Sequence, residues 1–439
     1  MIDVFPFAGL PVAVYGLDRG GLAAARALHA SGAEVWAWDD DESRRAAASE
    51  AGVPLVDLYL GDWRELTSLV VGGGIATDGA DAHPVVSRAR VGGCEVIGDV
   101  ELLVRTQRDA SFLGVTGIEG RSVTAALLGH ILQVSGREAE IGGGALMPAL
   151  ALHGLGAEGA YVLDLVPDDV TLTVSATFDV GVLVDCADTD ADAVAAMAGV
   201  FHRQTGPRAA VVGVDDPAGR HVFEKLKTAA EQVVIPVSGR ERVHGGVYVG
   251  GGMLTDDMDG AEVPVTDVSV LAALPGEAGA RYAAAAYAAA RAIGVGPPQA
   301  MACIQSFPGL VHYREPLGRV DGIAYVNDAA AASPTAVSRT LACFEAVQWI
   351  AGDETVAENG VPGTVAGRVR GVHVAGGGAE GLAAAVAAAH AAAMAEGGAG
   401  ASVVLSLGRR GGGGFADADA LGDAFRDLVE ALPGTHEEV

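Results

Sequence analysis

The stretch GVTGIEGRSVTA, residues 114–125, decides how the rest of the chain is interpreted. It follows a hydrophobic run at 112–115 and precedes a helical pattern of apolar residues at 124–132. A glycine loop between a buried strand and a helix presents backbone N–H groups to an anion, so the stretch resembles a phosphate-binding loop. The usual lysine of such loops is missing, because Arg121 stands before Ser122.

The composition is that of a globular α/β protein, in which helical and strand-like patterns alternate. The 439 residues, half of them hydrophobic, leave room for two or three domains. The formal net charge of −28 argues against nucleic acid as a partner, since polyanion binding depends on Lys and Arg. No window is apolar enough for membrane insertion, and the N-terminus lacks a signal-peptide pattern, so we predict a cytoplasmic protein.

Two residue types limit the chemistry further. The four cysteines lie far apart and form no metal-like pair, which predicts reduced core thiols at Cys94, Cys186, Cys303 and Cys343. The only two lysines of the chain, Lys225 and Lys227, lie close together in one segment. A mechanism that needs catalytic lysines on several domains is therefore excluded.

A first domain, residues 1–108, is predicted to be Rossmann-like. Strands are expected at 11–15, 34–38, 68–71 and 95–97, with helices at 20–30 and 100–109. Gly16 and Gly21 match part of a dinucleotide fingerprint, but Asp18 replaces the middle glycine that lets a pyrophosphate approach. A nicotinamide-dependent oxidoreductase built on this domain is an alternative that requires NADH binding.

Two further domains are predicted. The second, 109–297, begins with the strand before the glycine loop and ends at the Gly/Pro-rich hinge 294–298. Its other expected elements are strands at 161–165, 180–184 and 209–214 and an alanine-rich helix at 281–293. The third, 298–439, is expected to contain strands near 323–326, 347–351, 371–375 and 402–405 and a helix at 379–395.

The order of these segments resembles the Mur ligase family over nearly the whole chain. The resemblance rests on the stretches VAVYGLDRGGLAAARALHASGAEVWAWDD, EVIGDVELL, GVTGIEGRSVTAALLGHIL, VVGVDDP, SFPGLVHYREPLGRVDGIAYVND and WIAG. It implies three α/β domains: a Rossmann-like one for a UDP-sugar, a central P-loop-type ATPase domain and a Rossmann-like C-terminal domain for an amino acid. Family members phosphorylate a carboxylate with ATP, and an amine then attacks the acyl phosphate. The most similar branch adds D-glutamate to UDP-N-acetylmuramoyl-L-alanine.

The resemblance implies a uridine pocket on the first domain. Its residues would be Leu17, Asp18, Arg19, Asp39, Asp40 and Gly74. Asp39 lies about twenty residues after the glycine turn, where an acidic side chain can bond to a ribose or uracil group. The expected partners are therefore a UDP-muramoyl precursor or proteins of cell-wall synthesis.

At the glycine loop, the resemblance implies the remnants of an ATP site. The phosphate would meet Gly117, Gly120, Arg121 and Ser122, and the ribose would meet Asp328 of the third domain. Magnesium would bind Ser122 and Asp164, while Asp164, His312 and Asp328 would remain of the catalytic set. A planar guanidinium cannot occupy the space of a compact ammonium, so Arg121 does not replace the lysine faithfully. A Glu119 carboxylate about 4 Å from polyphosphate would add repulsion on the order of 4 kcal/mol.

Other charged groups of the family are absent. The lysine that carries a carbamate falls on Met197, and the segment of the metal-binding histidine becomes DCADTDADA, 185–193. Its Asp188-x-Asp190-x-Asp192 spacing lacks the glycine and glutamate of a calcium loop, so we predict a solvated acidic loop. The family's asparagine pattern becomes GEAGARY at 276–282, and the lysine of the third domain becomes Ala330.

Acyl phosphate formation needs cations around the transferring phosphoryl group, and several are missing together. We therefore predict a Mur-ligase-like protein of cell-wall metabolism that has lost ligase activity and binds a UDP-muramoyl precursor or a partner protein, with ATP and magnesium as cofactors only if some ligase activity remains. The alternative is an active ligase that uses ATP and magnesium through Arg121 and Asp164. Its amino acid, D-glutamate or another, would be held by Arg409 and Arg410 in the loop 406–414.

Overall fold

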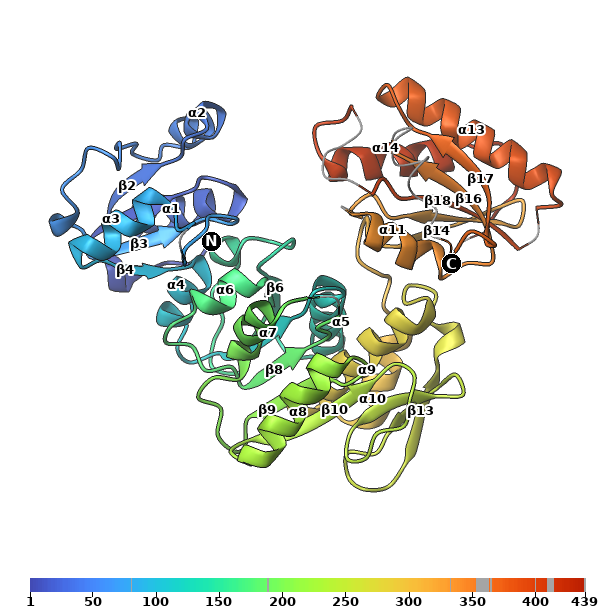
Figure 1. Ribbon diagram of the computed structural model, residues 1–439, viewed down its shortest axis with the longest axis horizontal. Coiled ribbons are helices and arrows are strands. Elements are labelled where there is room, and N and C mark those ends of the chain that lie inside the picture. Colours follow the sequence, from blue (N-terminus) through green and yellow to red (C-terminus); the bar gives the residue numbers. More distant parts are fainter. Residues whose placement is uncertain are drawn as a thin grey trace. The chain divides into compact units, whose positions relative to one another are not determined.

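The computed structural model describes residues 1–79, 81–187, 189–331, 333–352, 363, 365–398, 400–408 and 414–437. It contains three sheets, one in each predicted domain (Figure 1), and confirms the α/β class. The chain forms two compact units, one of Met1–Thr266 with Arg281–Ile304 and one of Asp267–Ala280 with Gln305–Val439. The domain limits at residues 108 and 297 remain predictions.

The first sheet is parallel, with strand order β2-β1-β3-β4. Its strands are β1 (Pro11–Tyr15), β2 (Glu34–Trp38), β3 (Ser68–Val71) and β4 (Glu95–Ile97), with the predicted bounds. Its helices are α1 (Arg19–Ala30), α2 (Glu42–Glu50), α3 (Pro84–Gly92) and α4 (Asp99–Thr106). The strands are nearly continuous apolar runs because helices cover parallel sheets.

The second sheet has the order β13-β12-β11-β10-β9-β8-β5-β7-β6. The strands are β5 (Ser111–Thr116), β6 (Ala139–Gly142), β7 (Ala160–Leu165), β8 (Val180–Leu183), β9 (Ala209–Gly213), β10 (Val233–Ser238), β11 (Val247–Gly250), β12 (Met253–Asp256) and β13 (Val263–Asp267). Strand β5 pairs in parallel with both β7 and β8, so chain connections diverge on its two sides. This is the point of a parallel sheet at which ligands usually bind.

The helices of this region are α5 (Arg121–Val134), α6 (Pro167–Thr171), α7 (Ala191–Ala198), α8 (Pro217–Ala229), α9 (Gly276–Ala292) and α10 (Pro297–Gln305). Short 3-10 helices lie at Phe5–Phe7, Trp63–Glu65, Ala149–Ala151, Gly199–Phe201 and Val268–Val270. The two prolines of the predicted hinge, Pro297 and Pro298, form the first turn of α10. Proline is favoured there because its missing N–H would have no partner in the helix.

The third sheet has the order β17-β16-β18-β15-β14-β19. Its strands are β14 (Glu315–Val320), β15 (Ile323–Asn327), β16 (Ala346–Ala351), β17 (Val369–Val374), β18 (Ala401–Leu405) and β19 (His436–Glu437). Helices α11 (Pro334–Leu341), α13 (Ala379–Ala395) and α14 (Ala418–Glu430) accompany it. The strands predicted near 323–326, 347–351, 371–375 and 402–405 and the helix predicted at 379–395 are all present.

Three of the four cysteines, Cys94, Cys186 and Cys303, are buried, and Cys343 is half-buried. None of them forms a disulfide in the part of the chain that the structure describes. In the same described part, no helix combines the length and the apolar character needed to cross a lipid bilayer.

Candidate functional site

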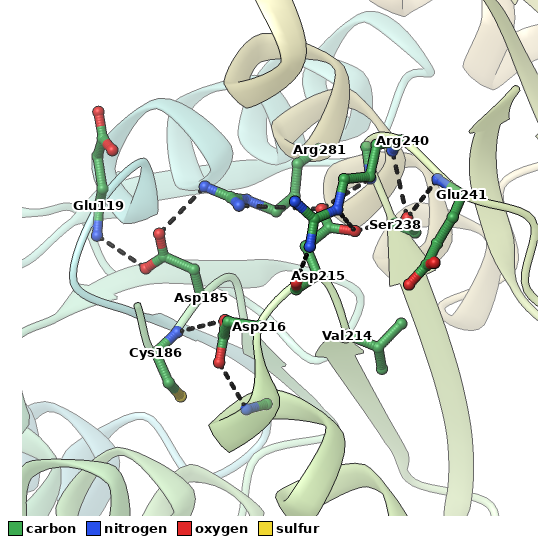
Figure 2. A network of polar contacts seen from close by, with 12 residues as sticks. Glu119, Asp185, Cys186, Val214, Asp215, Asp216, Ser238, Arg240, Glu241 and Arg281 are labelled. Atoms are coloured by element: carbon green, nitrogen blue, oxygen red, sulfur yellow. Dashed lines mark hydrogen bonds and ion pairs between the residues drawn. The ribbon is translucent and has the colours of Figure 1, made fainter. Parts of the chain in front are cut away.

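The glycine loop lies at the carboxyl edge of the second sheet, between β5 and α5. Neighbouring strands end at the same edge: β8 is followed by Asp185, β9 by Asp215 and Asp216, and β10 ends on Ser238 (Figure 2). Carboxyl ends of parallel strands meet at one edge of a sheet. Polar side chains far apart in the sequence therefore converge beside the loop.

Two glycines shape the loop. Gly117 has a φ of 150° and Gly120 a φ of 76°, which glycine adopts without steric cost. A Cβ at Gly120 would lie only 1.9 Å from the Tyr282 ring, so the ring packs directly against this glycine. Tyr282 is buried, and it stands where the family pattern ends in an asparagine. An aromatic ring therefore covers part of the loop.

Asp185 supplies a carboxylate to the loop itself. Its Oδ1 accepts hydrogen bonds from the backbone N–H groups of Ile118 and Glu119, each at 3.0 Å. Asp185 is 1% exposed. In Figure 2 the Glu119 carboxylate points away from Asp185, whose own carboxylate faces the loop. The anionic neighbour of the loop's N–H groups is therefore Asp185.

Arg281 holds the other oxygen of Asp185. Its Nη2 lies 3.1 Å from Asp185 Oδ2, and its Nη1 lies 3.8 Å from Asp215 Oδ2. The Arg281 side chain is 12% exposed. Burial opposes its charge, but Asp185, Tyr282 and Asp215 together raise its pKa. Asp215 is fixed in turn by the Ser238 hydroxyl, which donates a hydrogen bond at 2.5 Å. One guanidinium thus bridges carboxylates from the ends of β8 and β9.

The two predicted magnesium ligands, Ser122 and Asp164, lie together. Ser122 Oγ donates to Asp164 Oδ2 at 2.7 Å, and the Ala145 N–H donates to the same oxygen at 3.2 Å. Arg121 Nε lies 2.9 Å from Asp164 Oδ1. Burial raises the pKa of this fully buried carboxyl, and Arg121 and Ser122 act against that shift.

These contacts do not suit a magnesium ion, which needs near-octahedral oxygen coordination. Asp164 Oδ2 already accepts hydrogen bonds from Ser122 and Ala145, and Asp164 Oδ1 lies in an ion pair with the Arg121 guanidinium without a hydrogen bond in the described part of the chain. Within the described residues, no group of three His, Cys, Asp or Glu side chains is arranged to hold a metal ion. The two predicted magnesium ligands therefore lie together, but contacts within the chain, including the ion pair with Arg121, engage them.

The residues that stand in place of the family's carbamate lysine and metal-binding histidine segment have structural roles in this chain. Met197 is fully buried in α7, inside a hydrophobic core that spans the first two sheets. Asp190 accepts a hydrogen bond from the Ala193 N–H at 2.8 Å and thereby caps α7. Asp192 lies in the first helical turn, which favours acidic side chains, and Asp188 lies outside the described residues. The described part of the acidic run therefore starts a helix.

The predicted uridine-pocket residues all lie after the carboxyl ends of β1, β2 and β3. The Leu17 N–H donates to Asp39 Oδ2 at 2.6 Å, and the Asp41 N–H donates to Asp39 Oδ1 at 2.8 Å. Asp39 is buried, whereas Asp40 is exposed and accepts a hydrogen bond from the Tyr59 hydroxyl at 3.0 Å. Asp40 is therefore an acidic group of this edge that faces solvent.

The glycine turn of the first sheet carries its own carboxylate. Asp18 Oδ1 accepts a hydrogen bond from the Gly21 N–H at 2.9 Å, and a Cβ on Gly72 would lie 2.9 Å from the same oxygen. Arg19 and Gly74 are exposed at this edge. The structure thus brings the predicted residues together, while Asp18 caps the α1 N-terminus that would otherwise face an anion.

Asp328, the predicted ribose ligand, is buried in the C-terminal unit. Its Oδ2 accepts hydrogen bonds from Thr340 at 2.7 Å and from Ser406 at 3.0 Å, and its Oδ1 accepts one from the Arg314 N–H at 3.1 Å. Burial raises the pKa of Asp328 to about 6. Its carboxyl oxygens therefore serve the internal structure of this unit.

His312, the last remnant of the predicted catalytic set, is also buried. Its Nδ1 lies 3.0 Å from the amide nitrogen of Asn327, and its ring packs against Gly422 of α14. Arg409 and Arg410, the predicted anion-binding pair, lie outside the described residues.

Sequence reasoning did not assign Asp185 and Arg281 to the loop. In the sequence, Asp185 belongs to an acidic run and Arg281 to a degenerate asparagine pattern. One signal was present, because Asp185 directly follows the buried run 180–184 and so had to lie at the carboxyl edge of the sheet. Its pairing with a residue 96 positions later is a tertiary contact without a local signature.

The structure is that of a multidomain α/β protein with three sheets. Its glycine loop follows β5, the strand of the middle sheet at which the chain connections diverge. The chain is 36% identical over 365 residues to UDP-N-acetylmuramoylalanine–D-glutamate ligase of Phenylobacterium zucineum, covering 80% of this chain and 78% of that protein. It is 35% identical over 366 residues to the ligase of the same name from Rhodospirillum rubrum, covering 81% and 77%. The chain belongs to the Mur ligase family.

Solved structures show the same fold. The murein peptide ligase of Psychrobacter arcticus matches with a TM-score of 0.52 at 16% identity, covering 97% of this chain and 100% of that chain. MurF from Acinetobacter baumannii matches with a TM-score of 0.54 at 16% identity, covering 87% and 96%. No model of a known protein family matches the chain.

Proposed function

We propose that this protein is a Mur-ligase-like component of cell-wall metabolism that does not carry out ATP-dependent ligation and acts by binding. The observation that carries the proposal is the ion pair between Arg121 and Asp164, together with the bond from Ser122 to the same carboxylate. These contacts engage the groups that would have to receive phosphate and magnesium. The cell-wall context follows from the relatives, which are named as UDP-N-acetylmuramoylalanine–D-glutamate ligases.

The ion pair has a cost for any nucleotide that needs Arg121. Separating a buried pair and leaving one charge without its partner costs about 3–5 kcal/mol. Since each 1.4 kcal/mol is a factor of ten in affinity, ATP binding that pulled Arg121 from Asp164 would weaken at least about a hundredfold. The other guanidinium beside the loop, that of Arg281, is engaged by Asp185 and Asp215. Phosphoryl transfer depends on cations directed at the phosphates, and here the chain's own carboxylates neutralise them.

The first domain supports a UDP-muramoyl precursor as the ligand. Leu17, Asp39, Asp40 and Gly74 lie at one edge of its sheet, with Asp40 and Gly74 exposed. Because Asp18 caps the N-terminus of α1, the nucleoside would contribute more to recognition than the diphosphate. A protein of cell-wall synthesis is the alternative partner.

A thermal-shift screen with a ligase assay tests this proposal. Ligand binding to the folded state raises its stability, so UDP-N-acetylmuramoyl-L-alanine should raise the melting temperature, and Mg-ATP should leave it unchanged. Incubation of all substrates with D-glutamate should release no phosphate above a protein-free control. Phosphate release that depends on D-glutamate would contradict the proposal. A relative with ligase activity, assayed in parallel, shows that the substrates are competent.

An active ligase is the second candidate, and the 36% identity to a protein named as a ligase favours it. In that case Arg121 and Asp164 would separate when ATP and magnesium bind. Phosphate release by the wild type that is abolished in the Asp164→Asn variant would favour this candidate. Equal background release by both proteins would favour the binding protein.

A further inference from the structure

Glycine loops that bind phosphate do so with backbone N–H groups that have no partner within the helix. In this chain the N–H groups of Ile118 and Glu119 instead donate to one carboxylate oxygen of Asp185. We infer that Asp185 is a built-in anion that closes the glycine loop and that Arg281 locks it in place. This latch does not depend on which ligand the protein binds, and it goes beyond the loss of ligation proposed above.

The latch depends on where Asp185 sits. It lies two residues after the end of β8, and a Cβ on Gly117 would lie 3.2 Å from the Asp185 backbone nitrogen. Glycine at that position therefore lets the loop lie against the end of the strand. The Cys186 N–H donates to Asp216 Oδ2 at 3.0 Å, which fixes the backbone next to the latch. The backbone of Asp185 is thus fixed close to the loop, and its short side chain can reach the loop N–H groups.

Both oxygens of Asp185 have partners. Oδ1 faces the two loop N–H groups, and Oδ2 lies 3.1 Å from Arg281 (Figure 2). Arg281 is anchored on its other side by Asp215, so it cannot turn to solvent without leaving a buried carboxylate. An incoming phosphate would have to displace a carboxylate that is tethered to the site, and tethering gives it a high effective concentration.

Removing the carboxylate should convert the latch into an anion site. In an Asp185→Ala variant, the Glu119 N–H group and the Arg281 guanidinium would face the space that the carboxylate leaves, together with the Ile118 N–H group, which would keep only its long bond of 3.4 Å to the backbone carbonyl of residue 185. That donor set matches the geometry of a phosphate oxyanion, because a guanidinium fork and backbone N–H groups both bind such oxygens. The wild-type protein presents the same donors already bonded.

The test is calorimetric titration of the full chain with inorganic pyrophosphate at fixed ionic strength. We expect the Asp185→Ala variant to bind pyrophosphate at least tenfold more tightly than the wild type. Asp190→Ala is the matched control, since it removes one carboxylate from the acidic run without touching the loop. The double variant Asp185→Ala/Arg281→Ala should lose the gain. Equal affinity in the wild type and in Asp185→Ala, or an equal gain in Asp190→Ala, would overturn the inference.

A second measurement uses only the wild-type protein and therefore does not depend on a variant that folds. Amide hydrogen exchange should show the Ile118 and Glu119 N–H groups protected at least a hundredfold over unstructured peptides, without any nucleotide present. Glu119 is the diagnostic position, because the Ile118 N–H also donates to the Asp185 backbone carbonyl at 3.4 Å. Exchange at the unprotected rate would overturn the latch. This readout is separate from the proposed function, because a ligase reaction could be found whether or not these two N–H groups are protected.

Discussion

The two glycine turns of this molecule each lead from a buried strand into a helix, and each meets a carboxylate of the chain. In the first turn, Asp18 caps its own helix through an N–H three residues later. In the second, the carboxylate of Asp185 comes from 66 and 67 residues beyond the N–H groups that it accepts. Arg281, 96 residues further on, holds it there.

The two carboxylates differ in the free energy that a ligand would need to displace them from their turns. A helix cap is local and contributes about 1 kcal/mol, so a ligand can compete with it. The ion pair between the buried Asp185 carboxylate and the largely buried Arg281 guanidinium is a tertiary contact, and opening it leaves a buried charge without its partner. The first turn therefore stays compatible with a ligand, whereas the second does not.

The largest expected effect comes from breaking this tertiary contact. The Asp185→Ala variant should lose about 3–5 kcal/mol of unfolding free energy, because Arg281 remains buried without this carboxylate. Urea denaturation followed by circular dichroism, in buffer without phosphate, measures the change. A loss below about 1 kcal/mol would place Asp185 in the same class as a helix cap and remove the distinction between the two turns.

A slightly smaller effect is expected at the second internal pair. The Arg121→Met variant keeps much of the volume but leaves the fully buried Asp164 without its cation, so a loss of about 3 kcal/mol at pH 7 is expected. Because a protonated Asp164 needs no cation, the loss should shrink at pH 5. The Arg121→Lys variant should gain no ATP binding in calorimetry, since Asp164 and Asp185 remain. ATP binding by Arg121→Lys would show that the arginine alone closes the loop.

Two further carboxyl groups predict a pH dependence. Burial raises the pKa of Asp169 to about 8 and that of Asp99 to about 6, with smaller contributions from Asp99 and Asp18 respectively. Above about pH 4 the unfolded chain has released the protons that the folded protein still holds on these two carboxyl groups. The free energy of unfolding therefore falls as the pH rises from about 4 to the pKa of each group in the folded protein. At about 1.4 kcal/mol per pKa unit, these two groups predict a loss on the order of 5 kcal/mol between pH 5 and pH 8, most of it from Asp169, measured by urea denaturation.

The Asp169→Asn variant should remove most of that slope. Its amide oxygen can still accept the Val166 N–H, which donates to Asp169 at 3.1 Å. Equal stability of the wild type at pH 5 and pH 8 would contradict the expected titration. A slope that Asp169→Asn leaves unchanged would assign the effect to other buried carboxyl groups, Asp99 or Asp328.

The smallest effect is expected at the first turn. The Asp18→Ala variant should lose about 1 kcal/mol, the usual value of an N-cap. It should also bind UDP more tightly, because the N-terminus of α1 then faces the diphosphate. Asp41→Ala, which removes the cap of the neighbouring helix α2, is the matched control for stability. A gain in UDP affinity that is equal in both variants would show that only net charge matters.

Much of the fold could be predicted because its signals are local. The strands of the first sheet are apolar runs with polar or glycine ends, and their predicted bounds match the structure. The glycine loop was recognised because Gly117 and Gly120 stand between a buried strand and a helix. Strands β10 to β13 were not predicted. These four strands form the end of the sheet away from the glycine loop, beyond the segments that carry the motifs. Two of them, β11 and β12, pair antiparallel.

The candidate site could be predicted only in part. The resemblance located Asp39, Asp164 and Asp328, and all three lie in buried polar environments. Most of their partners could not be read from the sequence, because sheet order rather than spacing brings them there; the Asp41 N–H, two residues after Asp39, is a local exception. The same holds for the bond between Asp185 and Arg281, which joins the end of β8 to the helix α9.

Calorimetric titration of the wild-type protein with Mg-ATP tests most directly whether the chain's own carboxylates close the central loop. We predict no saturable binding up to about 1 mM, equivalent to an affinity weaker than about −4 kcal/mol. Saturable binding with a micromolar dissociation constant would contradict this account, since it would require Arg121 and Asp185 to yield to the nucleotide.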